Sequence, residues 1–165
     1  MGNVDAPAFS SIFDEHKEKV YRLCLGYAGD EDVARDLMQE SFIKVWQHLG
    51  TFRNEAAIGT WIYRITANTC LGHLRDAGKA RIDRLKRQHE AIADEPDNRH
   101  TQLEILHRCI GELEEQDRII IALVLESVPQ KQIAEITGIS EGNVRVKIHR
   151  IKEKLTQSYS RHDEL

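Results

Sequence analysis

The sequence has no apolar run long enough to cross a membrane, and it contains little cysteine. No segment approaches the roughly 18–20 apolar residues of a membrane helix, and residues 1–7 lack the basic start and apolar stretch of a secretory signal. The three cysteines, Cys24, Cys70 and Cys109, are widely spaced and form no C-x-x-C pair, which argues against a disulfide framework. We therefore expect a cytoplasmic protein whose thiols are reduced and buried, with no membrane insertion.

Motifs that carry chemistry are also missing. The sequence has no Gly-rich phosphate loop, no nucleophile motif and no metal-ligand cluster, because no second ligand pair at zinc spacing follows His107 and Cys109. An enzyme is therefore the least favoured class of function, although scattered Asp, His and Ser side chains could converge in the fold. We predict no catalytic residue, no metal and no cofactor.

Charge is distributed unevenly along the 165 residues, whose net charge is −4. Residues 61–88 carry +5 and residues 127–156 carry +3, whereas residues 89–126 carry −7. Binding to phosphate depends on local potential, since exposed charges more than about 10 Å apart are largely screened at ordinary salt. The overall acidity therefore does not exclude nucleic acid, and two basic segments are candidates for binding it.

Apolar residues recur at helical spacing, and no segment alternates with period two for long, so we expect helices and no sheet. Gly26 and Gly29 are expected to end the first helix, Asp30 or Asp32 to cap the second, and Gly50 to close the second. The predicted helices cover residues 9–27, 33–49, 60–75, 101–113 and 117–126, followed by the two helices of a C-terminal motif.

Residues 76–100 differ from these helices because they are rich in charge and poor in apolar anchors, which is typical of a connector. The sequence thus predicts an all-α fold of two small helical domains, residues 1–76 and 101–165, joined by a flexible linker over residues 77–100.

The C-terminal motif is a helix-turn-helix. A short helix containing Ile133 and Ile136 is followed by a turn with Gly138, and Ser140 can cap a second helix from Glu141. On a helical wheel one stripe of this second helix is apolar, and the opposite side is largely basic. The apolar stripe contains Val144, Ile148, Ile151 and Leu155. The opposite side contains Asn143, Arg145, Val146, His149 and Arg150.

This basic side favours duplex DNA. Val146 is an apolar residue on an exposed basic face, where it could contact a thymine methyl, while Arg145 and Arg150 reach guanine edges or phosphates. Lys147, Lys152 and Lys154 are expected to contact the phosphate backbone. The alternative is a solvated amphipathic helix, which the preceding turn and cap disfavour.

The third predicted helix and the loop before it are candidates for a DNA strand. Basic, amide and aromatic groups recur at turn spacing, and short polar side chains in the loop could hold a base swung out of the stack. From these residues alone a plain core role for Trp61, and a loop-pinning role for Phe52, is about equally favoured. The candidates are Phe52, Arg53, Asn54, Glu55, Trp61, Arg64, Asn68 and Arg75.

The second predicted helix leaves Ile43 among polar residues on one side and buries a stripe on the opposite side, which contains Ala34, Leu37, Met38, Phe42, Val45 and Leu49. An exposed apolar side chain ringed by polar ones is a modest indication of a protein partner. The polar residues on this side are Asp36, Gln39, Glu40 and Gln47.

With these features in order, the sequence resembles bacterial sigma factors of the extracytoplasmic-function (ECF, group IV) class of the sigma-70 family. The resemblance covers residues 9–155. It rests on Asp36-Leu37-Met38-Gln39-Glu40-Ser41-Phe42-Ile43-Lys44-Val45-Trp46, on Phe52-Arg53, on Thr60-Trp61-Ile62-Tyr63-Arg64-Ile65 with Asn68, and on residues 113–155.

The resemblance implies a transcription initiation factor that directs core RNA polymerase to promoters. The first domain would be sigma region 2, docking the β′ clamp helices through Asp36, Gln39, Glu40 and Ile43 and capturing the melted −10 element through residues 52–57, Arg64 and Asn68. The second would be region 4, reading the −35 element as duplex and meeting the β flap. The linker, with Asp94, Glu95 and Asp97, would run toward the RNA exit path, and a monomer silenced by an anti-sigma factor is implied.

Some positions depart from the family pattern. Glu114 stands where proline is frequent, so we expect a softer break between the flanking helices, and Pro129 stands where a capping serine is usual. The sequence is expected to lack the extra N-terminal segment and middle domain of housekeeping sigma factors. The competing interpretation is a helix-turn-helix regulator that binds operators as a dimer, with residues 1–100 serving oligomerisation or sensing.

Overall fold

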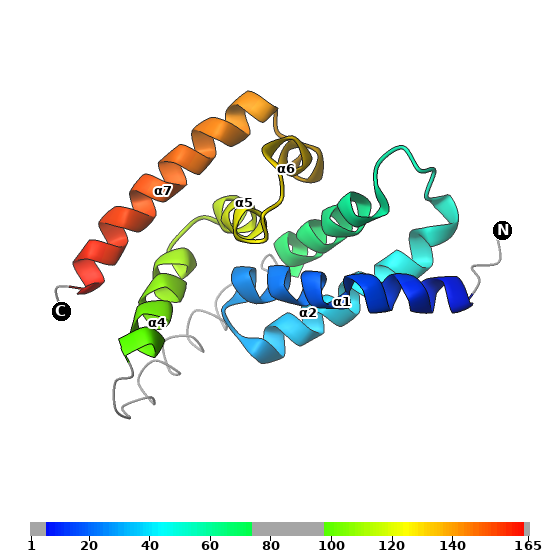
Figure 1. Ribbon diagram of the computed structural model, residues 1–165, viewed down its shortest axis with the longest axis horizontal. Coiled ribbons are helices and arrows are strands. Elements are labelled where there is room, and N and C mark those ends of the chain that lie inside the picture. The colour runs from blue at the N-terminus through cyan, green and yellow to red at the C-terminus, as the bar shows by residue number, and fades with distance from the viewer. Residues whose placement is uncertain (1–5, 74–97, 164–165) are drawn as a thin grey trace.

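The computed structural model describes residues 6–73 and 98–163, with side chains described in 8–73 and 102–163. Within these ranges the chain is helical and contains no strand, so the predicted all-α fold is confirmed (Figure 1). The elements are α1 (Ala6–Ala28), α2 (Glu31–His48), the 3-10 turn η1 (Leu49–Thr51), a helix over residues 58–73, α4 (Asn98–Gly111), α5 (Glu115–Leu125), α6 (Gln130–Thr137) and α7 (Glu141–Asp163).

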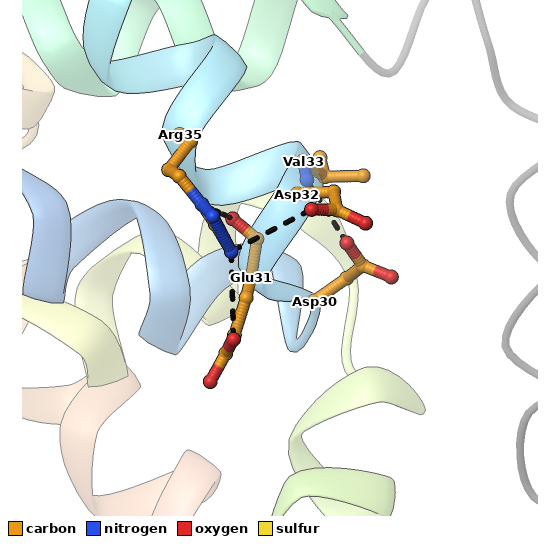
Figure 2. Close-up of polar contacts among 5 residues, drawn as sticks. All are labelled: Asp30, Glu31, Asp32, Val33 and Arg35. Atoms are coloured by element: carbon orange, nitrogen blue, oxygen red, sulfur yellow. Dashed lines mark hydrogen bonds and ion pairs between the residues drawn. The ribbon is translucent and has the colours of Figure 1, made fainter.

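The start of α2 shows the predicted aspartate cap. Asp30 is in extended conformation, and its carboxylate accepts a hydrogen bond of 2.9 Å from the backbone N–H of Val33 (Figure 2). Glu31 and Asp32 place negative charge in the first turn, where the helix dipole favours it, and Arg35 lies 3.5 Å from each carboxylate. The cap fixes where α2 begins.

The first half of the chain is built on the packing of α2 against α1. Ala34, Leu37, Phe42 and Val45 of α2 are buried, which agrees with the predicted stripe. Near the N-terminal end of α1 the rings of Phe9, Phe13, Phe42 and Trp46 form edge-on and stacked contacts with centroids 4.8–6.5 Å apart. The opposite face of α2 is left to solvent.

The prediction that Gly26 ends the first helix is wrong. Gly26 lies inside α1, which continues to Ala28, and the left-handed residue that ends the helix is Gly29 with φ of +67°. A Cβ placed on Gly26 would be 3.4 Å from Cβ of Ala122 in α5. Gly26 therefore faces a helix from the other half of the chain, at ordinary van der Waals distance.

The second half is arranged around α5, which is buried along most of its length. It packs against both α7 and α1, so buried residues of the two halves belong to a single apolar core (Figure 1). Across this junction Arg22 of α1 donates a 3.0 Å hydrogen bond to Glu126, and the Arg118 guanidinium lies 5.0 Å from the centre of the Tyr27 ring. The two halves are therefore in direct contact.

The predicted helix boundaries differ from the structure at the connector and after α4. Helix α4 begins at Asn98, inside the predicted linker, whose remaining residues, with Asp94, Glu95 and Asp97, lie outside the described part of the chain. The expected soft break at Glu114 is also wrong. Helix α4 ends at Gly111, and Glu114 is extended with φ of −60° and ψ of 154°, so a residue other than proline breaks the helix fully.

Candidate nucleic-acid interface and docking surface

The helix-turn-helix is formed by α6 and α7. Ile133 and Ile136 of α6 are buried, and Gly138 ends α6 in the left-handed conformation with φ of +74°. The hydroxyl of Ser140 accepts a hydrogen bond of 3.2 Å from the backbone N–H of Asn143, which confirms the predicted cap of α7. The turn at Gly138 and the cap at Ser140 together fix where α7 begins.

The wheel prediction for α7 agrees with the structure on both faces. Val144, Ile148 and Ile151 are buried, and Leu155 is half-buried. Val146 has 47% of its surface exposed although it is apolar. The outward residues, all exposed, are Asn143, Arg145, Val146, His149 and Arg150. This side of α7 presents cations, an amide and an apolar group together, as base-edge recognition in a major groove requires.

Lys147 is placed differently from the other candidates on α7. It is half-buried, and its ammonium donates a hydrogen bond of 3.4 Å to Oδ1 of Asp117 in α5. Lys154, expected to contact phosphate, lies 3.7 Å from Oδ2 of the same carboxylate. Lys152 is exposed. The structure thus separates two lysines held by α5 from the cations that face outward.

The strand-binding candidates lie on the loop before, and along, the helix over residues 58–73. The rings of Phe52 and Trp61 contact each other with centroids 4.9 Å apart, and both are half-buried. Asn54 adopts φ of +56°, an uncommon conformation for a side-chain-bearing residue. Arg53, Asn54, Glu55, Arg64 and Asn68 are exposed, whereas Arg75 lies outside the described residues.

Two roles were considered for the rings of Phe52 and Trp61, anchoring of the loop and core on one hand and contact with a DNA base on the other. Each ring is only partly covered, so the pair both anchors the loop and leaves aromatic surface accessible. The exposed polar groups of the loop surround it. Stacking of a base on such a surface is sequence-tolerant and suits a single strand.

The docking candidates form one exposed row on α2. Asp36, Gln39, Glu40 and Ile43 are all exposed, and Ile43 has 57% of its surface accessible. Glu40 forms an ion pair of 3.2 Å with Lys44. An apolar side chain beside acidic and amide groups on a rigid helix is suited to a protein partner.

A cavity of about 740 Å³ lies between the strand-binding candidates and the N-terminal end of α7. On one side it is lined by Glu55, Trp61 and Arg64, and on the other by Ser140 and Glu141 at the start of α7. The duplex-reading candidates farther along α7 do not line it.

The far end of α7 is tied to α4. Glu112 accepts a 2.5 Å hydrogen bond from the Ser158 hydroxyl, and Nε2 of His162 lies 2.8 Å from its other oxygen. The Ser158 hydrogen bond is the main cause that lowers the pKa of Glu112, and His162 adds to it. Both ends of α7 are thus fixed, one by Ser140 and the other by Glu112.

His16 is buried near the start of the helix over residues 58–73. Its Cε1 would lie 3.5 Å from a Cβ on Gly59, and Nε2 has no hydrogen-bond partner among the described residues. Burial lowers the pKa of His16, Glu15 raises it by less, and Lys19 lowers it further. The imidazole therefore favours the neutral form.

Asp117 is a further residue at this surface, because the structure places it beside two lysines of α7. The sequence offers one signal for it, an acidic residue two positions before an apolar helical run. In the described ranges no group of three His, Cys, Asp or Glu side chains could hold a metal, and no helix is long and apolar enough to span a membrane.

Comparison with known proteins assigns the chain to a family. The sigma-70 region 2 family matches residues 12–80, and the sigma-70 region 4 family matches residues 103–155. The chain is 30% identical to the ECF RNA polymerase sigma factor SigW of Bacillus subtilis, over 92% of this chain and 88% of the relative. It is 33% identical to the ECF RNA polymerase sigma-E factor of Haemophilus influenzae, over 92% and 87%.

A solved structure agrees at the level of the fold. The sigma factor RpoE of Bartonella quintana, in complex with the anti-sigma factor NepR, matches with a TM-score of 0.70 and 17% identity, over 93% of this chain and 97% of that one. The chain thus belongs to the ECF class of RNA polymerase sigma factors and acts in transcription initiation.

Proposed function

We propose that residues 1–76 and 101–165 are two working units of one initiation factor, joined by a linker over residues 77–100. The first unit docks core polymerase and holds the melted −10 strand, and the second reads the −35 element as duplex. The chain supplies specificity and has no catalysis of its own, and it works in the cytoplasm. The single observation that carries this proposal is the outward face of α7, which is exposed, basic and centred on Val146.

Each candidate residue takes a role from its exposure and chemistry. Arg145, Val146, His149 and Arg150, with Asn143, contact base edges or the adjacent phosphates, because they turn away from the core. Lys147 supports the same face from its pair with Asp117. The roles in direct readout thus belong to the exposed members of the set.

The strand-binding role rests on the aromatic pair and its polar surroundings. A base of the melted strand stacks on the accessible surface of Phe52 or Trp61, and Asn54 and Glu55 offer hydrogen-bonding groups. Arg53, Arg64 and Asn68 contact the backbone of the strand, and Arg75, outside the described residues, is proposed to do the same from its chemistry alone. These positions suit recognition of an unpaired strand better than of a duplex.

The docking role rests on the exposed row of α2. Ile43 supplies a buried apolar contact in the complex, and Asp36, Gln39 and Glu40 supply the surrounding polar contacts with the β′ clamp helices. The outer surface of the second unit meets the β flap. The free chain is a monomer that an anti-sigma factor holds silent. This last point is supported by the sigma factor of similar fold from Bartonella quintana, which was solved in complex with an anti-sigma factor.

Binding of both promoter elements requires the two halves to separate. Elements named for positions −10 and −35 lie about 25 base pairs apart, or roughly 85 Å at 3.4 Å per base pair. Here α1 packs against α5, and the strand-binding candidates lie across one cavity from the N-terminal end of α7. The junction between α1 and α5 therefore has to open when polymerase and promoter are engaged.

Run-off transcription with bacterial core polymerase on a promoter library tests this function. The proposal expects promoter-dependent transcripts only when the factor is added, together with a complex of factor and core polymerase. A dimer that binds palindromic duplex and ignores core polymerase would contradict it and support an operator-binding regulator instead.

A further inference from the structure

Asp117 is a buried carboxylate that faces two cations of the DNA-reading helix. It lies in the first turn of α5 and has 6% of its surface exposed. Its Oδ1 accepts a hydrogen bond from Lys147 at 3.4 Å, and its Oδ2 lies 3.7 Å from the Lys154 ammonium. Each oxygen thus serves a different lysine.

The two lysines are arranged along the axis of α7. Positions 147 and 154 are seven residues apart, which is two helical turns and about 10.5 Å of rise. They lie on the side of α7 that carries Ile148 and Ile151 toward α5. The carboxylate is therefore held between one cation nearer the start of the helix and one nearer its end.

Apolar packing alone does not fix the position of α7 along its axis. The stripe of Val144, Ile148 and Ile151 determines which face is buried, but hydrophobic burial is non-directional. A slide of one turn, about 5.4 Å, would present a similar apolar row. It would also leave the buried Asp117 with one cation or none, which is unfavourable because a buried charge needs its partners.

The same carboxylate alters the charge available to DNA. Helix α7 carries six Lys and Arg side chains, and Asp117 pairs with two of them. The outward cations near the start of α7 are then Arg145, Arg150 and Lys152. Nonspecific attraction to phosphate is reduced while the base-facing side is left unchanged.

We propose that Asp117 is a positioning residue for promoter recognition, which sets the axial register of α7 and restrains Lys147 and Lys154 from nonspecific phosphate contacts. The inference rests on the proposed role of α7 in reading duplex DNA. It predicts that loss of the carboxylate lowers discrimination between promoter and random DNA, even though the protein becomes more positive.

The test uses holoenzyme assembled from the full chain and bacterial core polymerase. The probes are a promoter fragment selected by run-off from a library and a random-sequence duplex of equal length. For D117N we expect affinity for the promoter to fall at least tenfold and affinity for random duplex to rise. The affinity of D117N for random duplex should also fall more steeply with salt. The steeper slope corresponds to the release of up to about two more counterions, one for each freed lysine.

Discrimination, taken as the ratio of the two affinities, separates positioning from simple destabilisation. A smaller folded fraction lowers both affinities equally and leaves the ratio unchanged. D117E keeps the charge and is expected to recover most of the ratio. The side chain of Lys154 is 59% exposed. The variant K154M loses one of the two contacts of Asp117 but frees no lysine for DNA. We therefore expect the ratio to fall about threefold, without a steeper salt dependence.

The results that overturn the inference are specific. An unchanged ratio in folded D117N, or in K154M if D117N does not fold, shows that the carboxylate does not position α7. A reduced ratio that D117E fails to restore assigns the effect to something other than the charge. If wild-type holoenzyme itself does not distinguish the selected promoter, the proposed function fails rather than this inference.

Discussion

Arg145 and Arg150 are exposed cations on the outward face of α7. Neither forms an ion pair with another residue in the described part of the chain. Replacement of either by alanine is expected to lower affinity for the selected promoter by about 1–3 kcal/mol, the range for a good base contact. Run-off transcription and filter binding measure the loss, and assembly with core polymerase should be unchanged.

A suitable control for the two arginines is Arg35→Ala, because Arg35 is exposed and its ion-pair partners among the described residues are neighbours on α2. This variant should transcribe normally. Equal loss of promoter binding and of polymerase binding in the α7 variants would contradict the assignment of this face to DNA.

Ile43 provides a test of the docking surface. Ile43→Asp places a charge where an apolar contact with the polymerase is proposed, and we expect at least a tenfold loss of affinity for core enzyme. Ile43→Leu is a matched control that should bind core enzyme normally, because it keeps an apolar side chain at the same exposed position. Unaltered affinity of folded Ile43→Asp in fluorescence-based titration with core enzyme would remove the reason to place docking on α2.

His16 predicts a specific pH dependence of stability. Its pKa is lowered below 6.5 because burial disfavours the imidazolium. The unfolded chain therefore binds the proton more tightly than the folded chain, so the contribution is complete above pH 6.5 and is lost as the pH falls toward the lowered value. Urea unfolding at pH 7.5 and 5.5 should show a smaller decrease for His16→Gln than for wild type.

His149→Gln is the control for this experiment, since His149 is exposed at the outward face of α7. It should retain the wild-type pH dependence of unfolding. If His16→Gln and His149→Gln behave alike, the buried imidazole is not the group responsible.

At the scale of the element, the start of α7 depends on a single side-chain cap. Ser140→Ala removes the acceptor for the Asn143 N–H and should lower the free energy of unfolding by about 1 kcal/mol. Ser140→Asp retains an acceptor and adds favourable charge at the helix N-terminus, so it should be close to wild type. Chemical denaturation compares the three proteins, and equal stability of Ala and Asp variants would exclude a capping role.

The helices themselves were accessible from sequence. Periodicity identified the buried sides of α2 and α7, and local chemistry identified the caps at Asp30 and Ser140. These features depend on residues close in sequence, so pattern reasoning reaches them. The fold class and the helix-turn-helix followed from the same signals.

Contacts between distant elements were not accessible in this way. Gly26 faces Ala122, which is far away in the sequence, so local patterns alone favour a helix end at Gly26. The ion pair of Lys154 with Asp117 likewise joins two different helices, and the phosphate contact of Lys154 stays a prediction. A helical wheel shows which face is buried, but it does not show what covers that face.

The candidate site shows the same division. The outward set on α7 followed from the wheel, because exposure on a helix is largely periodic. The contact of Phe52 with Trp61 did not, because it joins a loop to a helix and required the path of residues 52–57. The residue roles in DNA and polymerase binding remain predictions.

At the scale of the whole molecule, the two halves share one apolar core along α1 and α5. A Cβ on Gly26 would lie 3.4 Å from Cβ of Ala122, close to the separation of about 3.5–4.5 Å found in disulfides. The double variant Gly26→Cys/Ala122→Cys should therefore form a disulfide that holds the halves together. Oxidised protein is expected to lose promoter-dependent transcription, and reduced protein to recover it.

The single variants Gly26→Cys and Ala122→Cys are controls, and they should transcribe equally in both redox conditions. If the fully oxidised double variant initiates as well as its reduced form, the junction does not need to open. The proposed separation of the two units would then be wrong, while the assignments of individual residues would stand.

The natural thiols offer a practical route to observing this motion. Cys24, Cys70 and Cys109 each have at most 1% of their surface exposed. Maleimide dyes should consequently react with cysteines engineered at the surface in preference to the native ones. A donor and an acceptor placed on α2 and α7 would then report single-molecule energy transfer in an otherwise unaltered chain, as polymerase and promoter are added in turn.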